Sequence, residues 1–336
     1  MFKQKPTAFI FFLLLFLLVV FVLNPYYLFL TKTLKISPLK TLFSLDSLKI
    51  YDHQVTVLIL GIPGKNYQGG TLSDSIIVAN YDLKTHQLLT ISLPRDIWSN
   101  TLKDKINTVY AYGEAKQKNG GLKLAKVEVA AVIGIPIQYS AVIDFAEFKE
   151  LVDFLGGIDV DIERSFTDNQ FPVIGRENDQ CGDDDQEFKC RYETVSFQKG
   201  RTHMDGSTAL KYVRSRHATG VEGSDFARNR RQQKVLAAIK NELKKSMGKL
   251  SLKRWKTIYQ TFTRLFTRDI TNQQIAIMLK NIIFSANFSQ KEIVLSPDFF
   301  LVPDNTSSNG QYILIPKDGN FKDIHRYIRS KGRQTP

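Results

Sequence analysis

The chain has 336 residues, which is enough for one large domain with appendages or for two small domains. Hydrophobic residues make up 43% of it, so a wholly disordered chain is excluded. Its 46 basic and 33 acidic residues give a net charge of +13, which favours an anionic partner such as nucleic acid, lipid headgroups or a phosphorylated substrate. Two cysteines are too few for a disulfide scaffold or a four-cysteine zinc site.

The first 30 residues predict a membrane anchor. Residues 1–7 form a short tail with Lys3 and Lys5, and residues 8–23 are 16 consecutive apolar residues. After an Asn-Pro pair the apolar character resumes, so residues 8–30 provide 23 residues where a bilayer span needs about 20. A cleaved signal peptide is the alternative, but no small-x-small cleavage site follows the apolar run.

The charges beside this segment bear on its orientation. The basic tail favours a cytoplasmic N-terminus, whereas Lys32, Lys35 and Lys40 on the other flank oppose it. Because a short N-terminal tail usually stays inside, we expect a single-pass protein of the cell membrane. Residues 31–51 are then a linker, and the body of the chain is extracytoplasmic.

The two cysteines fit that compartment. Cys181 and Cys190 bracket an acidic run at residues 183–185, and a bridge between them closes a small loop of the kind that an oxidising exterior permits. Two unpaired thiols remain the alternative.

From residue 52 onward, strands and helices alternate along the chain. Short β-branched apolar runs predict strands at residues 55–60, 75–81, 87–93, 138–145, 158–162 and 312–316, with a hairpin turn at 82–86. Helical patterns cover residues 107–133 (broken at 119–121), 146–155, 205–213, 224–245, 253–266, 271–285 and 321–330. Residues 165–199 are polar and predict an irregular excursion that holds both cysteines. This order predicts an α/β fold with a mixed central sheet flanked by helices on both faces.

Several common catalytic motifs are absent. The five histidines form no HExxH pattern, and the chain has no GxSxG and no GxGxxG after a strand. Residues 61–66 (Gly-Ile-Pro-Gly-Lys-Asn) resemble a phosphate-binding P-loop, but two residues separate the glycines where four are needed. We interpret this segment as a turn at the end of a strand.

Arginines gather where predicted elements begin and end. Arg95 follows a strand, Arg214 and Arg216 end one helix, and Arg228 and Arg231 lie in the opening turns of the next helix, beside Arg230 and Gln232. Cations near a helix N-terminus oppose the helix dipole, and an anion bound there explains them, because backbone N–H groups and guanidinium groups converge on phosphate oxygens. A solvated basic face, or Arg–Asp pairs within the fold, is the alternative.

An acidic residue adds to the same hypothesis. Asp74 lies directly before a predicted strand. A carboxylate beside several arginines can hold Mg²⁺ against a diphosphate, although an isolated Asp at this place is more often a turn residue.

Eight short stretches, in the same order as in the family, resemble the LytR-CpsA-Psr (LCP) family of cell-envelope proteins. They lie at residues 57–61, 73–75, 92–96 (Ser-Leu-Pro-Arg-Asp), 105–107, 155–160, 204–210, 212–216 and 225–233. The resemblance implies an LCP-like α-β-α catalytic domain at residues 52–246, which residues 247–336 complete. It also implies an extracytoplasmic phosphotransferase that moves a glycopolymer from a polyprenyl diphosphate carrier to peptidoglycan, forming a phosphodiester.

The resemblance also implies roles for individual residues. The diphosphate would be bound by Arg95, Lys105 (more weakly), Arg214, Arg216, Arg228, Arg231 and Gln232. Asp74 would act with Arg95 in catalysis, by binding Mg²⁺ or Mn²⁺ or by orienting the attacking hydroxyl. A second metal-binding acid is expected after the Ser-Asp-Ser motif, where the candidates are Asp82 and the non-acidic His86.

Two other functions use the same features. A lipid-diphosphate hydrolase would need the same residues with water as the acceptor, and a non-catalytic surface protein would bind anionic polymer through the net charge of +13. Nucleic acid is not expected as a partner, because an exported domain seldom meets it. The expected partners are therefore the polyprenyl diphosphate-linked glycan, peptidoglycan and the membrane.

Overall fold

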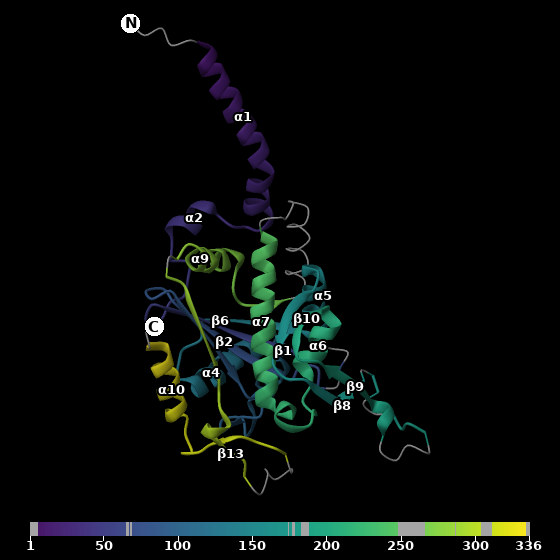
Figure 1. Ribbon diagram of the computed structural model, residues 1–336. Helices are drawn as coiled ribbons and strands as arrows, with labels where there is room; N and C mark the ends of the chain where they lie inside the picture. Colours follow the sequence, from purple (N-terminus) through teal and green to yellow (C-terminus); the bar gives the residue numbers. More distant parts are fainter. Residues whose placement is uncertain are drawn as a thin grey trace.

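A six-stranded mixed sheet forms the centre of the computed structural model (Figure 1). Its strand order is β11-β6-β1-β2-β3-β12. The strands are β1 (Gln54–Ile62), β2 (Ser75–Asp82), β3 (Gln87–Leu93), β6 (Tyr139–Asp144), β11 (Thr267–Arg268) and β12 (Ser289–Val294). The pairs β1–β2, β2–β3 and β6–β11 are antiparallel, and the pairs β1–β6 and β3–β12 are parallel. The predicted mixed sheet is confirmed.

The structure describes residues 6–64, 67, 69–173, 175–176, 179–182, 188–247, 266–285, 287–303 and 311–333. Except for its last residue, the helix predicted at 253–266 lies outside them.

Helices cover both faces of the sheet, as the sequence predicts. Even-numbered residues of β1, such as Leu58 and Leu60, pack in one core against α3 (Val109–Lys116), α4 (Gly120–Ile133) and α10 (Lys322–Arg333). The other face is covered by α7 (Asp225–Met247), whose Gln233 donates to the hydroxyl of Ser92 on β3 at 2.6 Å. Because side chains alternate along a strand, the odd-numbered residues of β1 lie on this face, where Val55 and Val57 pack with Ile277 of the helix Asn272–Ile283 and Ile59 lies nearer to α7.

A second core lies beside the central sheet. It joins α5 (Phe145–Leu155), α6 (Gly206–Arg214) and part of α7 to an antiparallel pair, β7 (Ile158–Ile162) with β10 (Gly200–Met204). Asp205 caps α6 as predicted, because its side chain accepts from the backbone N–H of Thr208.

The prediction of an irregular segment at residues 165–199 was wrong in part. This segment contains β8 (Phe166–Pro172) and β9 (Tyr192–Phe197), which pair antiparallel. The register shifts between Asp168 and Phe171, so the alternation that marks a strand in sequence is interrupted. Cys181 and Cys190 are joined in a disulfide, with their Cα atoms 5.5 Å apart.

Several short elements escaped the sequence analysis. They are the strand β12, the two-residue pair β4 (Trp98–Ser99) with β5 (Asp104–Lys105), the strand β13 (Phe300–Leu301) and the helix α2 (Pro38–Phe43). The partner of β13 is β14 (Ile315–Pro316), which lies within the strand predicted at residues 312–316. The helix α9 (Asn272–Ile283) falls where it was predicted and packs on α2.

The N-terminal helix α1 (Pro6–Leu28) continues into a π-helical turn, Phe29–Thr33, and projects from one end of the body (Figure 1). Its described side chains are mostly exposed. No helix within the described ranges meets both the length and the apolarity required to cross a bilayer.

Candidate active site

A cavity opens where β1 and β6 end, β2 begins and α7 crosses the sheet. Its polar lining comprises Asp74, Ser75, Arg95, Asp144, Asp168, Arg214, Arg216, His217, Arg228 and Gln232. The apolar part of the lining includes Ile59, Ile77, Ile143, Phe148, Leu210, Val213, Val235 and Leu236. Ile59 and Ile77 are odd-numbered residues on the sheet face that α7 covers, so the cavity lies between the sheet and this helix.

Ion pairs link the charged residues at the polar end. Arg95 Nη1 pairs with Asp74 Oδ1, and Arg95 Nε lies 3.9 Å from Asp225 Oδ2. The other oxygen of Asp225 is 2.9 Å from Arg228 Nη1. Two loops and the first turn of α7, which are distant in sequence, therefore meet in one charged network.

Arg228 is the most deeply buried cation of this network. Its side chain is 3% exposed, and its Nε and Nη2 have no hydrogen-bond partner among the described residues. Burial lowers the pKa of the Arg228 guanidinium, against the charge of Asp225, but an arginine stays protonated. A buried charge with unpaired donors is costly, so this group is suited to receive an anion from the cavity.

The carboxyl groups of Asp96 and Asp225 are hydrogen-bonded to each other beside Arg95. Burial, followed by the hydrogen bond with Asp225, raises the pKa of Asp96, although the ammonium of Lys105, 2.8 Å away, opposes this. Burial also acts to raise the pKa of Asp225. The positive charge of Arg228, the hydrogen bond with Asp96 and the positive charge of Arg95 together outweigh burial, so the pKa of Asp225 lies below its ordinary value. The pKa of Asp96 therefore lies above its ordinary value and the pKa of Asp225 below it, so Asp96 is the member of the pair that takes up a proton more readily.

Arg214 and Arg216 reach the cavity from the C-terminal end of α6. The Arg214 guanidinium carbon lies 4.5 Å from the centre of the Phe145 ring, a cation–π contact that fixes this side chain on an aromatic surface. The backbone N–H of Arg216 donates to Asp168 Oδ2 at 3.0 Å. Asp168 is buried on β8, and sequence reasoning missed it because its segment was predicted to be irregular.

Asp144 forms another wall of the cavity, and it caps α5. Its Oδ1 accepts from the Glu147 N–H at 2.8 Å, and Glu147 Oε2 accepts from the Asp144 N–H at 2.7 Å. Burial raises the pKa of Glu147 to about 7, although the hydrogen bond from Asp144 opposes the shift. The sequence analysis assigned no role to this pair.

The structure does not bring three of the expected site residues into the cavity. Arg231 Nε donates to the Tyr212 carbonyl at 3.0 Å and its Nη1 pairs with Glu222 at 2.8 Å, so it ties α7 to the end of α6. Lys105 pairs with Asp96 behind Arg95. Both are absent from the cavity lining.

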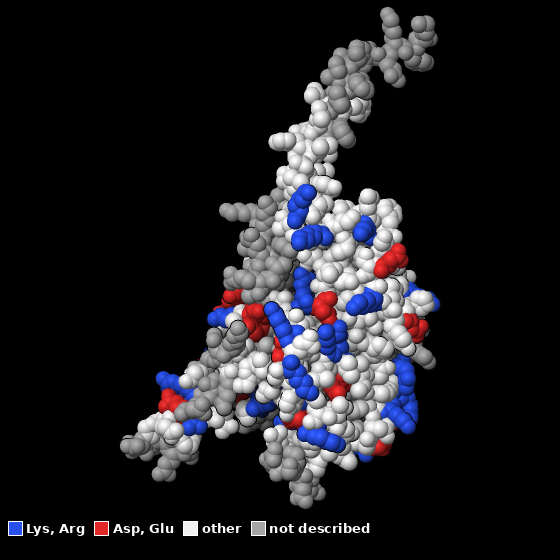
Figure 2. All heavy atoms as spheres, turned by 180° about the vertical axis from the view of Figure 1, so that it is seen from behind, with Lys and Arg blue, Asp and Glu red and all other residues white. Residues whose placement is uncertain are grey.

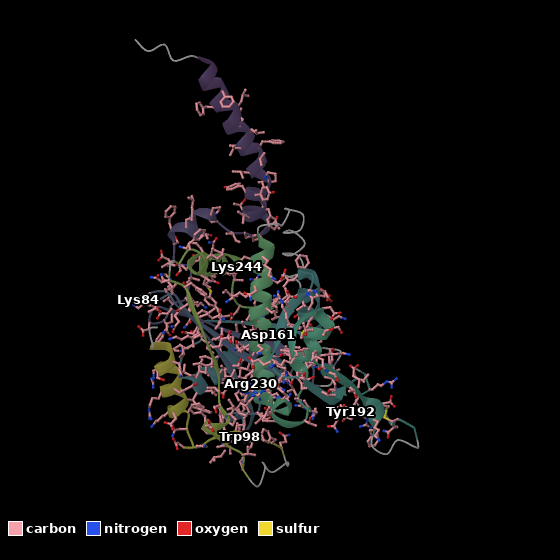
Figure 3. The ribbon with its side chains drawn as sticks, viewed as in Figure 1. Lys84, Trp98, Asp161, Tyr192, Arg230 and Lys244 are labelled. Carbon is pink, nitrogen blue, oxygen red and sulfur yellow. A yellow bond between two sulfur atoms is a disulfide. The ribbon has the colours of Figure 1, made fainter. Side chains whose placement is uncertain are left out.

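Asp82 is the third, and it lies at the far end of β2 from Asp74. Its Oδ1 accepts from the backbone N–H groups of Lys84 and Thr85, both at 2.8 Å, so it stabilises the hairpin turn. Figure 3 shows Lys84 at the edge of the molecule, well away from Arg230 in the first turns of α7. His86, which the sequence placed beside Asp82, contacts the Tyr81 hydroxyl at 3.0 Å. Neither residue provides a second acid for a metal at Asp74.

The carboxylate of Asp74 is a suitable Mg²⁺ ligand only in combination with others. In the described part of the chain, one group of three side chains brings metal-ligand atoms within 4.8 Å of one another: Asp179, Cys181 and Cys190, whose sulfurs form the disulfide. Mg²⁺ commonly binds through one or two carboxylates together with substrate phosphates and water. The donor chemistry of Asp74 beside the arginines fits that mode.

Comparison with known proteins identifies relatives. TagU from Bacillus cereus, named polyisoprenyl-teichoic acid–peptidoglycan teichoic acid transferase, is 28% identical over 231 residues, which are 68% of this chain and 64% of that protein. Regulatory protein MsrR from Staphylococcus aureus is 32% identical over 197 residues, which are 57% of this chain and 50% of that protein. The chain thus aligns with less than two thirds of the length of these relatives.

Solved structures share the fold. TagV from B. subtilis matches with a TM-score of 0.55 and 24% identity, over 85% of this chain and 100% of that one. TagT bound to LIIa-WTA matches with a TM-score of 0.57 and 22% identity, over 84% and 93% of the two chains. The model of the LytR_cpsA_psr family matches residues 32–326, which are most of the sequence. This protein therefore belongs to the LytR_cpsA_psr family.

Proposed function

We propose that this protein is an extracytoplasmic phosphotransferase that moves a glycopolymer from a polyprenyl diphosphate to peptidoglycan. The observation that carries the proposal is the buried Arg228, a residue of the cavity lining whose Nε and Nη2 have no hydrogen-bond partner in the described part of the chain. A diphosphate supplies the anionic oxygens that these donors lack. The relative TagU, named as a teichoic acid transferase, supports the same class of reaction.

The reaction exchanges one phosphorus–oxygen bond for another. An acceptor hydroxyl of peptidoglycan attacks the phosphorus that carries the glycopolymer, the bond to the bridging oxygen breaks, and polyprenyl monophosphate leaves. The proton of the hydroxyl passes to a base, for which Asp74 is the cavity carboxylate beside Arg95. Phosphoryl transfer needs mainly positioning and charge neutralisation, which Arg95, Arg214 and Arg228 provide without a nucleophilic side chain.

Asp74 is the residue that we propose to hold Mg²⁺ or Mn²⁺. When bound, such an ion neutralises charge on the phosphate oxygens. In its absence, Arg95 and Arg228 still bind and orient the diphosphate. The Oε1 of Gln232 accepts from the Ser75 hydroxyl at 2.9 Å, and this bond holds α7 against the start of β2 beside the two arginines.

The apolar part of the cavity suits the lipid carrier. Val235 and Leu236 lie about two turns along α7 from Arg228, in the direction of Lys244. Figure 3 shows Lys244 near one end of α7, and this end of α7 lies at the same end of the body from which α1 projects. We propose that the polyprenyl chain lies against this lining, and that α1 anchors the protein in the membrane, so that enzyme and lipid substrate are concentrated on one surface. The disulfide supports an exterior location for the body.

The proposal is tested by incubating the full chain with a labelled glycan on a lipid diphosphate, with and without peptidoglycan. Label that joins peptidoglycan supports the transferase. Release of free label at the same rate without acceptor indicates a hydrolase instead. Binding that is lost in high salt, with no turnover, indicates a non-catalytic polymer-binding protein.

A further inference from the structure

The short helix α2 is packed with its polarity reversed. Its Thr41 and its N-cap residue Ser37 face the protein, since Gln273 of α9 accepts from the Ser37 N–H at 2.6 Å and donates to the Thr41 hydroxyl at 2.9 Å. Its apolar residues point outward: Leu39 is 70% exposed and Phe43 is 82% exposed. A surface helix of a protein bathed only in water shows the opposite arrangement.

The helix α9 continues this apolar surface. Its Ile277 is buried in the protein core, whereas Leu279, Ile283 and the following Phe284 are exposed, Phe284 by 81%. Lys280, on the same side of the helix, donates to the Leu42 carbonyl at 3.5 Å and so connects the two helices. We call the exposed side chains of Leu39, Leu42, Phe43, Leu279, Ile283 and Phe284 the α2–α9 platform.

Most charged residues around the platform are basic, and the exposed Asp46, three residues after Phe43, is an exception. Lys32, Lys35, Lys40 and Lys280 belong to its helices or to the turn that leads into them. No Asp or Glu occurs before Asp46, and α9 contains none. Figure 2 shows basic side chains where the N-terminal segment meets the body and on the body directly below it, with an acidic side chain nearby.

The platform also lies where α1 meets the body. Figure 1 shows α2 and α9 at the end of the molecule from which α1 projects, with β13 at the opposite end. The exposed apolar side chains of α1 and the platform thus lie at the same end of the body, joined by the π-helical turn Phe29–Thr33 and the residues before α2.

We propose that the α2–α9 platform rests on the surface of an anionic lipid bilayer. Apolar side chains enter the boundary between headgroups and acyl chains, and the lysines pair with anionic headgroups, as in interfacial amphipathic helices. This contact supplements α1, because a single helix leaves the body free to tilt, whereas a second contact fixes how the cavity faces the membrane. The inference rests on the membrane association proposed above. A second protein copy is disfavoured, since it would have to cover apolar residues that are surrounded mainly by lysines.

The test uses the full chain reconstituted in vesicles of phosphatidylglycerol and phosphatidylcholine. A bimane probe is attached to a cysteine introduced as Phe43→Cys or Phe284→Cys, while the native cysteines stay bonded in their disulfide. Leu301→Cys on β13, where the native side chain is 50% exposed, is the matched control. We expect brominated acyl chains to quench positions 43 and 284 at least threefold more than position 301, and aqueous iodide to show the reverse order.

Two outcomes overturn the proposal. Iodide quenching of positions 43 and 284 as strong as that of position 301 means that water covers the platform. Protection of both positions from iodide and from brominated lipid alike means that protein covers it.

A second measurement separates this proposal from the proposed reaction. We expect the combined Leu42→Ser, Phe43→Ser and Phe284→Ser variant to lose about fivefold in transfer rate in vesicles but none in detergent micelles, with Leu301→Ser unchanged in both. Equal rates of this variant and the unaltered chain in vesicles contradict a role for the platform. No transfer by the unaltered chain in micelles instead contradicts the proposed function, and the quenching result still decides the platform.

Discussion

The hydroxyl of Ser75 donates to Oε1 of Gln232 at 2.9 Å, across 157 positions of the sequence. This bond joins the first residue of β2 to the second turn of α7, directly beside Asp74 and Arg228. The docking of α7 on the sheet is therefore what assembles the charged end of the cavity.

We expect a double-mutant cycle to detect this bond. Ser75→Ala and Gln232→Met should each lower the free energy of unfolding. The double variant should lose about 1 kcal/mol less than the sum of the two single changes, because the first change already breaks the bond and the second has none left to break. Urea unfolding of the four proteins measures it. Strict additivity of the two changes contradicts a bond that contributes to docking.

Arg228→Lys should lower the transfer rate by about 10²–10³, because a lysine cannot direct several donors at a diphosphate. Arg230→Lys, an exposed change in the same helix turn, is the matched control and should stay within about twofold. Pyrophosphate should raise the melting temperature of the unaltered chain and of the control, but not of Arg228→Lys. An equal shift in all three proteins contradicts the assignment of Arg228.

Asp74→Asn should lower the transfer rate by about 10² and raise the Mg²⁺ concentration needed for half-maximal activity by about tenfold, because an amide is a weaker ligand for a hard cation. Asp82→Asn removes a carboxylate from the same strand, at the end where it only stabilises the turn. It should leave the Mg²⁺ dependence unchanged. Mg²⁺ titrations of both variants decide between the two acids.

Glu147 should make stability depend on pH. Its pKa is raised from 4.5 to about 7, so the folded protein binds this proton more tightly than the unfolded chain. Its stabilising protonation is complete below about pH 4.5 and is lost as the pH rises through about 7. Because the group is half-exposed, we expect a loss on the order of 1 kcal/mol. Glu147→Gln should remove this part of the dependence, as measured by urea unfolding at pH 4.5 to 8; an unaltered profile contradicts it.

Replacing both cysteines by serine should lower the free energy of unfolding by about 2–3 kcal/mol, since the disulfide closes a loop with a sequence separation of 9. Transfer should be unchanged, because neither cysteine lines the cavity. Thermal melting and the transfer assay check the two statements. A loss of activity at unchanged stability indicates that the loop contacts the substrate.

The local pattern of the sequence determined much of the fold. Alternation and β-branched runs predicted β1, β2, β3 and the turn at residues 82–86, because these elements depend on neighbours in the chain. Residues 165–199 were predicted to be irregular because they are polar, and the structure shows that a register shift between Asp168 and Phe171 also interrupts the alternation of β8. The strand β12 was missed because its residues are mostly half-buried and polar, so it is recognisable mainly by its partner β3.

The sequence by itself also determined which chemical groups are present: arginines at element ends, an acid before a strand, and an apolar N-terminal segment. Only the tertiary structure decided which of them meet. Arg228 and Arg231 are three residues apart on one helix, yet one faces the cavity and the other holds the end of α6, because a rotation of about 300° around the helix changes the neighbour that each side chain meets. Asp74 and Asp82 are likewise separated by the length of a strand. Contacts of this kind depend on how segments that are distant in sequence pack together, and the local periodicity of a sequence does not determine that packing.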